Sequence, residues 1–275
     1  MENDRHDMIW PIIFRNHINM ESIIVKKDGL SFELDQTKST AKIINSPQAR
    51  DNIFISKSIN YLSQEYLITR IDDYCFKDNR QICSIKFSED SELCSIGNRA
   101  FCYSSIEVLY IPSTVDMLEE GWCSNTKNLN HVYLSPNNKN YKYLDETQKI
   151  IIGKSDSKSD TIVFSCRDII RVTIPSSIKQ IGSYAFNHSN LKHINFEKNS
   201  KLEIIEIGAF DKCQLISFEI TANVYQLKDG WLGNRWNQID FSISPENKVF
   251  KFINESMIVG KSDPKKDEFD VLVLA

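Results

Sequence analysis

A short apolar pattern that recurs at a nearly constant interval is the feature of this sequence that most restricts its fold. The pattern apolar-x-x-apolar-x-apolar appears, for example, in residues 106–111 (IEVLYI) and 191–196 (LKHINF). Successive middle residues lie 22 to 24 residues apart, except for one step of 40, and the whole cycle returns after 110 residues. A unit of this length cannot bury its own apolar face, so neighbouring units are expected to stack. The middle residues are Leu62, Ile85, Leu109, Val132, Val172, Ile194, Phe218 and Phe241.

A second motif, a small residue followed by an aromatic one, lies between these strand-like segments. Alanine precedes phenylalanine in three copies, cysteine takes the small position in a fourth, and two variants end in Gly-Trp. The small residue leaves room for the neighbouring coil, and the aromatic rings are expected to stack as a buried spine. The pairs are Cys75-Phe76, Ala100-Phe101, Gly121-Trp122, Ala185-Phe186, Ala209-Phe210 and Gly230-Trp231.

The two periods together predict the fold class. One strand in about 20–29 residues is the signature of a leucine-rich repeat. Alternate side chains of each strand then point into the core and the others point out. We therefore expect a β-rich leucine-rich-repeat solenoid over residues 1–275, right-handed, with a parallel strand face, short helical turns and projecting β-hairpins.

The long step of the cycle predicts where these hairpins lie. It contains two additional apolar runs, which is typical of a β-hairpin inserted into a coil. Hairpins are expected near residues 30–56, 141–166 and 250–275. Residues 1–25 do not follow the repeat and are expected to form a divergent N-terminal cap.

The repeat also resembles a known family. Residues 174–186 (IPSSIKQIGSYAF) look like the consensus of BspA-like leucine-rich repeats, as do residues 111–115 (IPSTV). The 110-residue cycle is similar to BspA-like surface antigens of parasitic protozoa, of the trichomonad type, over residues 62–275. The resemblance implies a non-enzymatic binding or adhesion protein, at the cell surface or secreted, that presents a repeat face to a protein or glycan partner. It supplies no catalytic residues.

An intracellular leucine-rich-repeat scaffold for protein–protein interaction is the alternative function. No apolar run approaches the roughly 20 residues of a membrane span. The first residues also lack the basic start of a secretory signal. The seven cysteines form no CxxC pair, and an odd number of them favours reduced thiols. A cytoplasmic location is therefore the alternative to the cell surface.

The sequence offers little support for an enzyme or a cofactor site. Gly153-Lys154-Ser155 ends like a phosphate-binding loop, but Gln148 stands where that loop requires a glycine. The five histidines form no HxxxH or HExxH pattern. We therefore expect no catalytic residue, no metal and no cofactor. The net charge of −4 also argues against nucleic acid as the partner.

The outward strand positions are the expected binding surface. Parallel strands lie about 4.8 Å apart, so Tyr110 and Tyr133 are expected to be neighbours. Exposed aromatic neighbours often supply much of the binding energy at protein interfaces. The alternative is that these rings only shield the strands from water. The predicted partner-binding face comprises Val108, Tyr110, His131, Tyr133 and Arg171.

The C-terminal segment predicts self-association. Residues 271–275 (VLVLA) match residues 161–165 of the previous cycle, which lead there into a further coil. Solenoids usually end in a cap with a polar outer face, whereas this segment is apolar. The segment either belongs to a longer array or pairs with another chain through an open sheet edge. Both explanations predict self-association through an uncapped C-terminal end.

Overall fold

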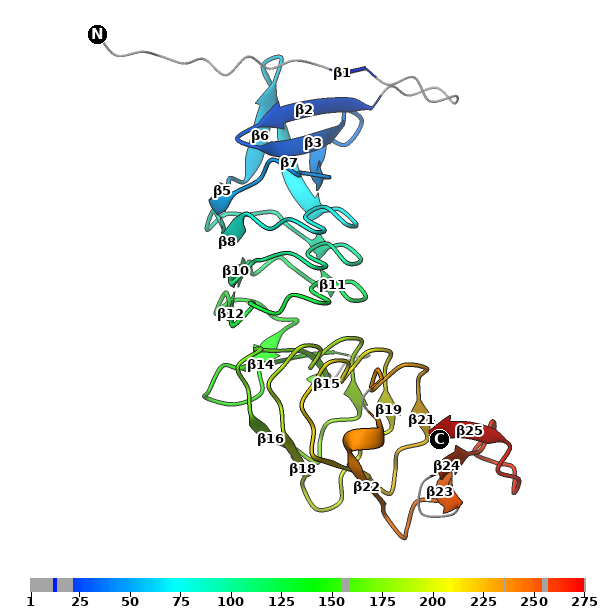
Figure 1. Cartoon of the computed structure of the whole chain (residues 1–275). Helices are drawn as coiled ribbons and strands as arrows, with labels where there is room; N and C mark the ends of the chain where they lie inside the picture. Colours follow the sequence, from blue (N-terminus) through cyan, green and yellow to red (C-terminus); the bar gives the residue numbers. More distant parts are fainter. Residues whose placement is uncertain (1–11, 14–21, 155–158, 235, 254–256, 275) are drawn as a thin grey trace. The chain divides into compact units, whose positions relative to one another are not determined.

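The computed structural model describes residues 12–13, 22–154, 159–234, 236–253 and 257–274 (Figure 1). Nearly all regular structure in these residues is β-strand, and their only helix is the short 3-10 turn η1 (Trp236–Gln238). The chain divides into two compact units, Met1–Lys139 and Asn140–Ala275. Both units contain parallel strands contributed by successive coils, so the predicted β-rich solenoid is confirmed.

The first unit contains two sheets. One is parallel, in the order β12-β10-β8-β5, and the other has the order β1-β2-β3-β4-β7-β9-β11, with β6 attached to β7. The coils of β8 and β10 each contribute a longer strand to the first sheet and a two-residue strand, β9 or β11, to the second. Of the predicted N-terminal cap, residues 1–25, only residues 12–13 and 22–25 are described. The strands are β1 (Ile12–Ile13), β2 (Ile23–Lys27), β3 (Leu30–Asp35), β4 (Thr40–Ile44), β5 (Asp51–Ile55), β6 (Ser58–Tyr61), β7 (Gln64–Ile71), β8 (Ile82–Phe87), β9 (Ser95–Ile96), β10 (Val108–Ile111), β11 (Met117–Leu118) and β12 (His131–Leu134).

The second unit repeats this plan. One of its sheets has the order β13-β14-β15-β17-β19-β21 and is parallel from β15 onward. The strands on the other side of the coils pair as β16 with β18 and β20 with β22, and an antiparallel sheet β23-β24-β25 follows. The strands are β13 (Lys142–Tyr143), β14 (Ile150–Lys154), β15 (Ser159–Ser165), β16 (Arg171–Ile174), β17 (Gln180–Ile181), β18 (His193–Phe196), β19 (Ile204–Ile205), β20 (Ser217–Ile220), β21 (Gln226–Leu227), β22 (Asp240–Ile243), β23 (Phe250–Ile253), β24 (Met257–Gly260) and β25 (Val271–Leu274).

The register of the longer strands confirms the predicted inward positions. Leu109 pairs with Ile85 on one side and with Val132 on the other, and Phe218 pairs with Phe241. Ile85 and Leu109 are fully buried. Burial of such a side chain contributes about 1.5–3 kcal/mol, so a row of equivalent positions accounts for much of the stability of the stack.

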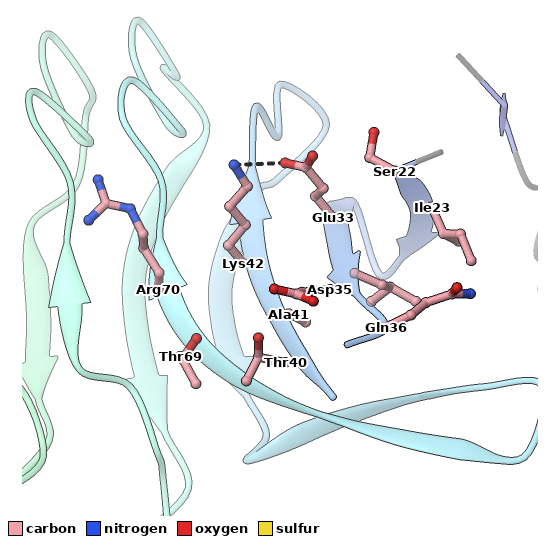
Figure 2. A pocket seen from close by; sticks show the side chains of 11 residues that line it. Ser22, Ile23, Glu33, Asp35, Gln36, Thr40, Ala41, Lys42, Thr69 and Arg70 are labelled. Atoms are coloured by element: carbon pink, nitrogen blue, oxygen red, sulfur yellow. Dashed lines mark ion pairs between the residues drawn. The ribbon is translucent and has the colours of Figure 1, made fainter. Parts of the chain in front are cut away.

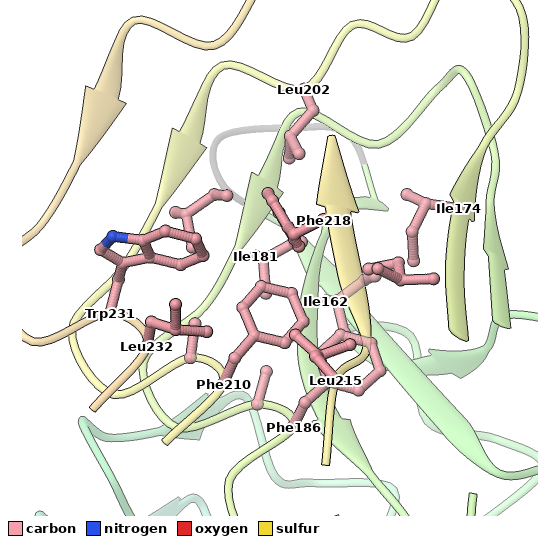
Figure 3. Packing of buried hydrophobic residues seen from close by; sticks show 14 of the residues in the cluster. Ile162, Ile174, Ile181, Phe186, Leu202, Phe210, Leu215, Phe218, Trp231 and Leu232 are labelled. Carbon is pink, nitrogen blue, oxygen red and sulfur yellow. The ribbon is translucent and has the colours of Figure 1, made fainter. Parts of the chain in front are cut away.

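The aromatic residues of the turns form two buried stacks, as the small-aromatic motif predicts. The rings of Phe76 and Phe101 lie 5.2 Å apart at 10° in the first unit. Those of Phe186 and Phe210 lie 5.2 Å apart at 8° in the second. Figure 3 shows the second pair packed with Phe218 inside the apolar core of its unit. Each coil therefore contributes one ring to a stack that joins it to its neighbour.

The turns that carry these rings are not helical, which corrects the prediction of short helical turns. The N–H of Phe76 donates to the carbonyl of Ala100 on the next coil at 2.7 Å, whereas the N–H of Asn79 donates within its own turn to Phe76 at 3.1 Å. Positive φ angles recur in the turns, for example at Tyr74 (54°) and Asp78 (59°). A residue with positive φ interrupts a right-handed helix. The backbone N–H groups of residues 74–79 alternate between bonds to the next coil and bonds within the turn.

Glycine follows the short strand in two coils because the neighbouring backbone lies very close. A Cβ atom on Gly97 would stand 2.7 Å from the amide nitrogen of Asp73 and 2.8 Å from the carbonyl carbon of Asp72. A Cβ atom on Gly182 would stand 2.8 Å from the carbonyl oxygen of Ile162. Neither position has room for a side chain, so glycine sets the distance between the coils.

Leu62 is not a core position, which corrects the start of the predicted cycle. It lies in the tight turn between β6 and β7, with a φ of 48° and an exposed fraction of 82%. The residue that pairs with Ile85 is Ile53 on β5. The β6–β7 hairpin is inserted between β5 and β8, and Leu62 falls at the repeat interval only by coincidence.

The antiparallel strands near residues 30–56 and 141–166 are part of the sheets and do not project from them. β15 pairs antiparallel with β14 on one edge and parallel with β17 on the other. β4 is likewise antiparallel with β3 and parallel with β7. The closing strand of each hairpin thus supplies backbone donors and acceptors to the coil that follows. The third set, near residues 250–275, forms the separate sheet β23-β24-β25.

Candidate functional site

The outward side chains of β5, β8, β10 and β12 form a continuous face of the first unit. The parallel register places Val108 beside His131 and Tyr110 beside Tyr133. It continues through β8, where Ser84 pairs with Val108, to β5. We call this surface the aromatic face. Its members are Asn52, Phe54, Ser84, Lys86, Val108, Tyr110, His131 and Tyr133.

Stacked rings order the centre of the aromatic face. The rings of Tyr110 and Tyr133 lie 4.8 Å apart at 28°, and His131 stacks on Tyr133 at 6.0 Å and 15°. The ammonium group of Lys86 lies over the ring of Tyr110, 4.7 Å from its centre. The two tyrosines are therefore neighbours, as the sequence predicts. Such contacts hold the side chains in defined positions before any partner binds.

Exposure determines which of these side chains are available to a partner. Tyr133 is 40% exposed and Phe54 is 66% exposed, while Tyr110 is partly covered by its neighbours. Tyrosine offers a large apolar ring and a hydroxyl that donates or accepts a hydrogen bond. The face thus combines apolar area with a few polar groups, which is the composition of protein-binding surfaces.

Arg171, the fifth predicted member of the face, lies in the second unit. It starts β16 and pairs in register with His193 on β18. The structure places it with that strand pair, and its contribution to the surface formed by the tyrosines stays a prediction.

Phe54 is the exposed aromatic residue that the sequence analysis missed. The repeat interval points to Leu62 and not to β5, so it does not predict Phe54 as a member of the face. The alternation in residues 51–55 (DNIFI) was the available signal, because Ile53 and Ile55 point inward and Phe54 between them points outward. Asn52 on the same strand accepts a hydrogen bond from Ser84 at 2.6 Å, which fixes β5 at the edge of the face.

A second candidate site is a charged hollow on the other sheet of the first unit, with a volume of about 650 Å³. Figure 2 shows Lys42 on β4 pointing toward Glu33 on β3, with Arg70 on β7 nearby. The ammonium group of Lys42 lies 2.7 Å from a carboxylate oxygen of Glu33 and 3.1 Å from one of Asp72. The cation on this side of the hollow is therefore already paired.

Arg70 forms the centre of the same ion-pair network. Its guanidinium contacts Asp72 at 3.1 Å and Asp73 at 2.6 Å, and it also pairs with Glu119 beyond β11. Burial alone would raise the pKa of Asp72, but hydrogen bonds from Arg70 and Lys42 outweigh it and the pKa is lowered. The hydrogen bond from Arg70 likewise lowers the pKa of Glu119. The network joins three coils, and because its four carboxylates face only two cations it keeps an excess of negative charge.

This network predicts an acid-dependent loss of stability. The folded pKa values of Asp72 and Glu119 lie below their ordinary values of 3.8 and 4.5. The stabilisation is therefore fully present above the ordinary values and disappears as the pH falls through the lowered ones. We expect the urea midpoint to fall over this pH range, and to fall less steeply in Arg70→Met. Identical pH slopes for the two proteins would contradict the prediction.

Burial makes two of the cysteines and one N-glycosylation motif unreactive. Burial raises the pKa of the Cys213 thiol to about 12, and burial also raises that of Cys75 well above its usual range. A buried thiol that stays protonated is a poor nucleophile. Asn187, in the motif Asn187-His188-Ser189, is fully buried, so the folded chain cannot present it for glycosylation. The second motif, at Asn254, lies outside the described residues.

The described part of the chain contains no group of three or more His, Cys, Asp or Glu side chains that could hold a metal ion. It also contains no helix that is long and apolar enough to cross a membrane.

The repeats of this chain match a known family of proteins. Residues 48–146 and 137–237 match the model of the BspA type leucine rich repeat region, in six copies. None of the curated proteins matches the sequence.

Solved structures of leucine-rich repeat proteins are similar to this chain. One from Eubacterium ventriosum has 17% identity and a TM-score of 0.51, over 79% of this chain and 71% of its own. One from Bacteroides ovatus has 14% identity and a TM-score of 0.39, over 80% and 67%. A leucine rich cell surface protein from Faecalibacterium prausnitzii has 13% identity and a TM-score of 0.34, over 81% and 95%. At such identities the first of these likenesses shows a shared fold.

Proposed function

The chain belongs to the family of BspA-type leucine-rich repeat proteins, and on that premise we propose that it is a non-enzymatic adhesion protein whose aromatic face binds a protein partner. The pair Tyr110 and Tyr133 carries the proposal. Their rings are stacked, outward-facing and ordered by Lys86 and His131 before binding. Ordered tyrosines lose little conformational entropy at an interface, so more of their contact energy appears as affinity.

The charge of the aromatic face supports a protein partner. Only Lys86 and His131 among its eight members can carry a charge, so little desolvation cost opposes burial. Tyrosine is also one of the residues most enriched at interface hot spots. A glycan that stacks on the same rings is the competing partner, and the experiment below separates the two.

The proposed role in adhesion at the cell surface rests on the resemblance of the 110-residue cycle to BspA-like surface antigens. One observation favours a second function, an intracellular scaffold: all seven cysteines are free. Free thiols are typical of reducing compartments. Staining of intact and permeabilised cells with an antibody distinguishes the two, because a surface protein is labelled without permeabilisation.

We expect the double change Tyr110→Ser and Tyr133→Ser to leave folding intact and to weaken partner binding by at least about 30-fold, or roughly 2 kcal/mol. The immobilised chain captures partners from host-cell and producing-cell lysates, and the affinity of each captured protein is then measured. A glycan array with the same variants tests the competing partner.

A matched control comes from the same unit. Tyr74 and Tyr103 are exposed by 45% and 40%, but they lie in the turns and not on the aromatic face. Tyr74→Ser with Tyr103→Ser should leave the affinity nearly unchanged. If the two double variants lose the same affinity for the partner, or if neither loses any, the aromatic face is not the binding surface.

A further inference from the structure

The outer edge of β5 is not covered by another strand among the described residues. Within that part of the chain β5 ends the sheet β12-β10-β8-β5 and pairs only with β8. The strands that precede it, β2, β3 and β4, all belong to the other sheet of the unit. The edge is therefore open because of how the strands are divided between the two sheets. Such an edge offers N–H and C=O groups to any strand that can align with them.

The pairing with β8 shows which backbone groups of β5 point to the open edge. The carbonyl of Ile55 accepts a hydrogen bond from the N–H of Ser88 at 3.0 Å, so the backbone of Ile55 points toward β8. Because this direction alternates along a strand, the backbone groups of Phe54 and Asn52 point to the open edge. The side chain of Asn52 accepts a hydrogen bond from Ser84 on β8 at 2.6 Å, so it leans away from that edge.

A hollow of about 290 Å³ runs along the same edge. Residues 52–56 line one side of it, and residues of the β2–β3 and β6–β7 hairpins line the others. Leu30, Phe32 and Ile59 are buried at its base. This volume lies at the lower end of the range for small-molecule sites, so it suits a side chain better than a whole ligand. A strand added to β5 could place one of its side chains there.

The charged residues of the hollow favour an acidic side chain. Lys27, Arg50 and Asp28 line it, so it carries one net positive charge. Neither Lys27 nor Arg50 forms an ion pair with a described residue, whereas Lys42 and Arg70 in the same unit are both paired with carboxylates. An arginine can bind a carboxylate through two parallel hydrogen bonds. A carboxylate in the hollow would therefore complement both cations.

We propose that an extended acidic segment of a protein partner binds here as a further strand on β5. The outward backbone groups of Asn52 and Phe54 pair with the segment, which is the usual mode of strand addition to an open edge. A carboxylate of the segment enters the hollow beside Lys27 and Arg50. The ring of Phe54, which is 66% exposed, packs against a neighbouring side chain of the added strand.

Two synthetic peptides test the proposal with the 275-residue chain. Each has about eight residues of alternating threonine and valine, with a central glutamate in one peptide and a central lysine in the other. Hydrogen exchange followed by NMR measures the N–H groups of Asn52 and Phe54. We expect their exchange to slow at least about tenfold with saturating glutamate peptide. The lysine peptide should bind at least about tenfold more weakly.

Two changes at position 54 separate the backbone pairing from the aromatic ring. Phe54→Ser keeps the N–H group and should keep most of the affinity for the glutamate peptide. Phe54→Pro removes the N–H group and should weaken binding at least about tenfold. Because this N–H group does not bond to β8, the proline leaves the sheet intact.

A change of charge tests the hollow separately from the backbone. Arg50→Glu should reverse the preference, so that the lysine peptide binds more tightly than the glutamate peptide. Lys127→Glu is the matched control, because Lys127 is exposed in the turn before β12 of the same unit and does not line the hollow. The double variant Tyr110→Ser with Tyr133→Ser should bind the glutamate peptide normally. A failure of the aromatic face is thereby distinguished from a failure of this edge.

Several results would overturn the proposal. Slow exchange of the Phe54 N–H group without peptide would show that the chain itself covers the edge. Binding of neither peptide, equal binding of both, or the same shift in Arg50→Glu and Lys127→Glu would remove the acidic segment as the ligand. Equal losses in Phe54→Ser and Phe54→Pro would mean that the ring binds and the backbone does not. A free chain that dimerises unless it carries Phe54→Pro would make a second copy the occupant.

Discussion

Replacement of Phe210 by alanine is expected to lower the free energy of unfolding by about 3–5 kcal/mol. The ring is 1% exposed and stacks on Phe186 with a centre distance of 5.2 Å. It also meets Phe218 and Trp231 edge-on, at 5.3 Å and 6.0 Å. Truncation therefore removes contacts on several sides and leaves a cavity between the coils.

The loss is expected to spread beyond one coil. In a stacked array each coil is stabilised mainly by its neighbours, so a weakened contact loosens both sides. Hydrogen exchange should show reduced protection in β17, β19 and β21 together. Tyr225→Ala is the control in the same unit, because Tyr225 is 39% exposed and its truncation should cost well under about 1 kcal/mol. A Phe210→Ala midpoint equal to that of Tyr225→Ala would show that the spine contributes little.

Replacement of Gly97 by alanine is expected to cost about 2–3 kcal/mol, although it adds a single methyl group. Its Cβ atom would collide with the backbone of Asp72 and Asp73 at 2.7–2.8 Å. Backbone cannot move aside as a flexible side chain does. The coils must therefore separate, which weakens the hydrogen bond from the Gly97 N–H to the Ile71 carbonyl, now 2.8 Å long.

Gly230→Ala is the comparison that isolates this effect. A Cβ atom there meets nothing within 4 Å, but the φ of +68° is unfavourable for alanine. We expect a cost of about 1 kcal/mol, from backbone conformation alone. Urea unfolding of both variants measures the difference. If Gly97→Ala proved as mild as Gly230→Ala, the close approach of the coils would not limit the residue at position 97.

Several features of the aromatic face could be predicted because they depend on local pattern. Alternation within a strand decides which side chains point outward, and the repeat interval decides which strands are neighbours. The pairing of Tyr110 with Tyr133 follows from these two facts alone. Phe54 was missed because an inserted hairpin lengthens its coil, and a fixed interval cannot reveal an insertion of unknown length.

The ion-pair network could not be predicted, because its members come from separate coils. Arg70 and Glu119 are 49 residues apart and meet only after the strands β7, β9 and β11 have aligned. Any of the many charged residues of the chain could have formed such pairs. Side-chain direction and distance, which exist only in the folded unit, select the ones that do.

The sequence by itself determined the solenoid, most of its inward positions and its aromatic spines, because burial imposes a period that the coils without an insertion repeat. Only the tertiary structure decided how the coils join. Part of the turn hydrogen bonds run between coils, Gly97 has no room for a side chain, and the closing strands β4 and β15 lie within the sheets. These features depend on the distance between backbones that are not adjacent in sequence. The repeat period predicts which residues are buried, but it does not predict which atoms these residues contact.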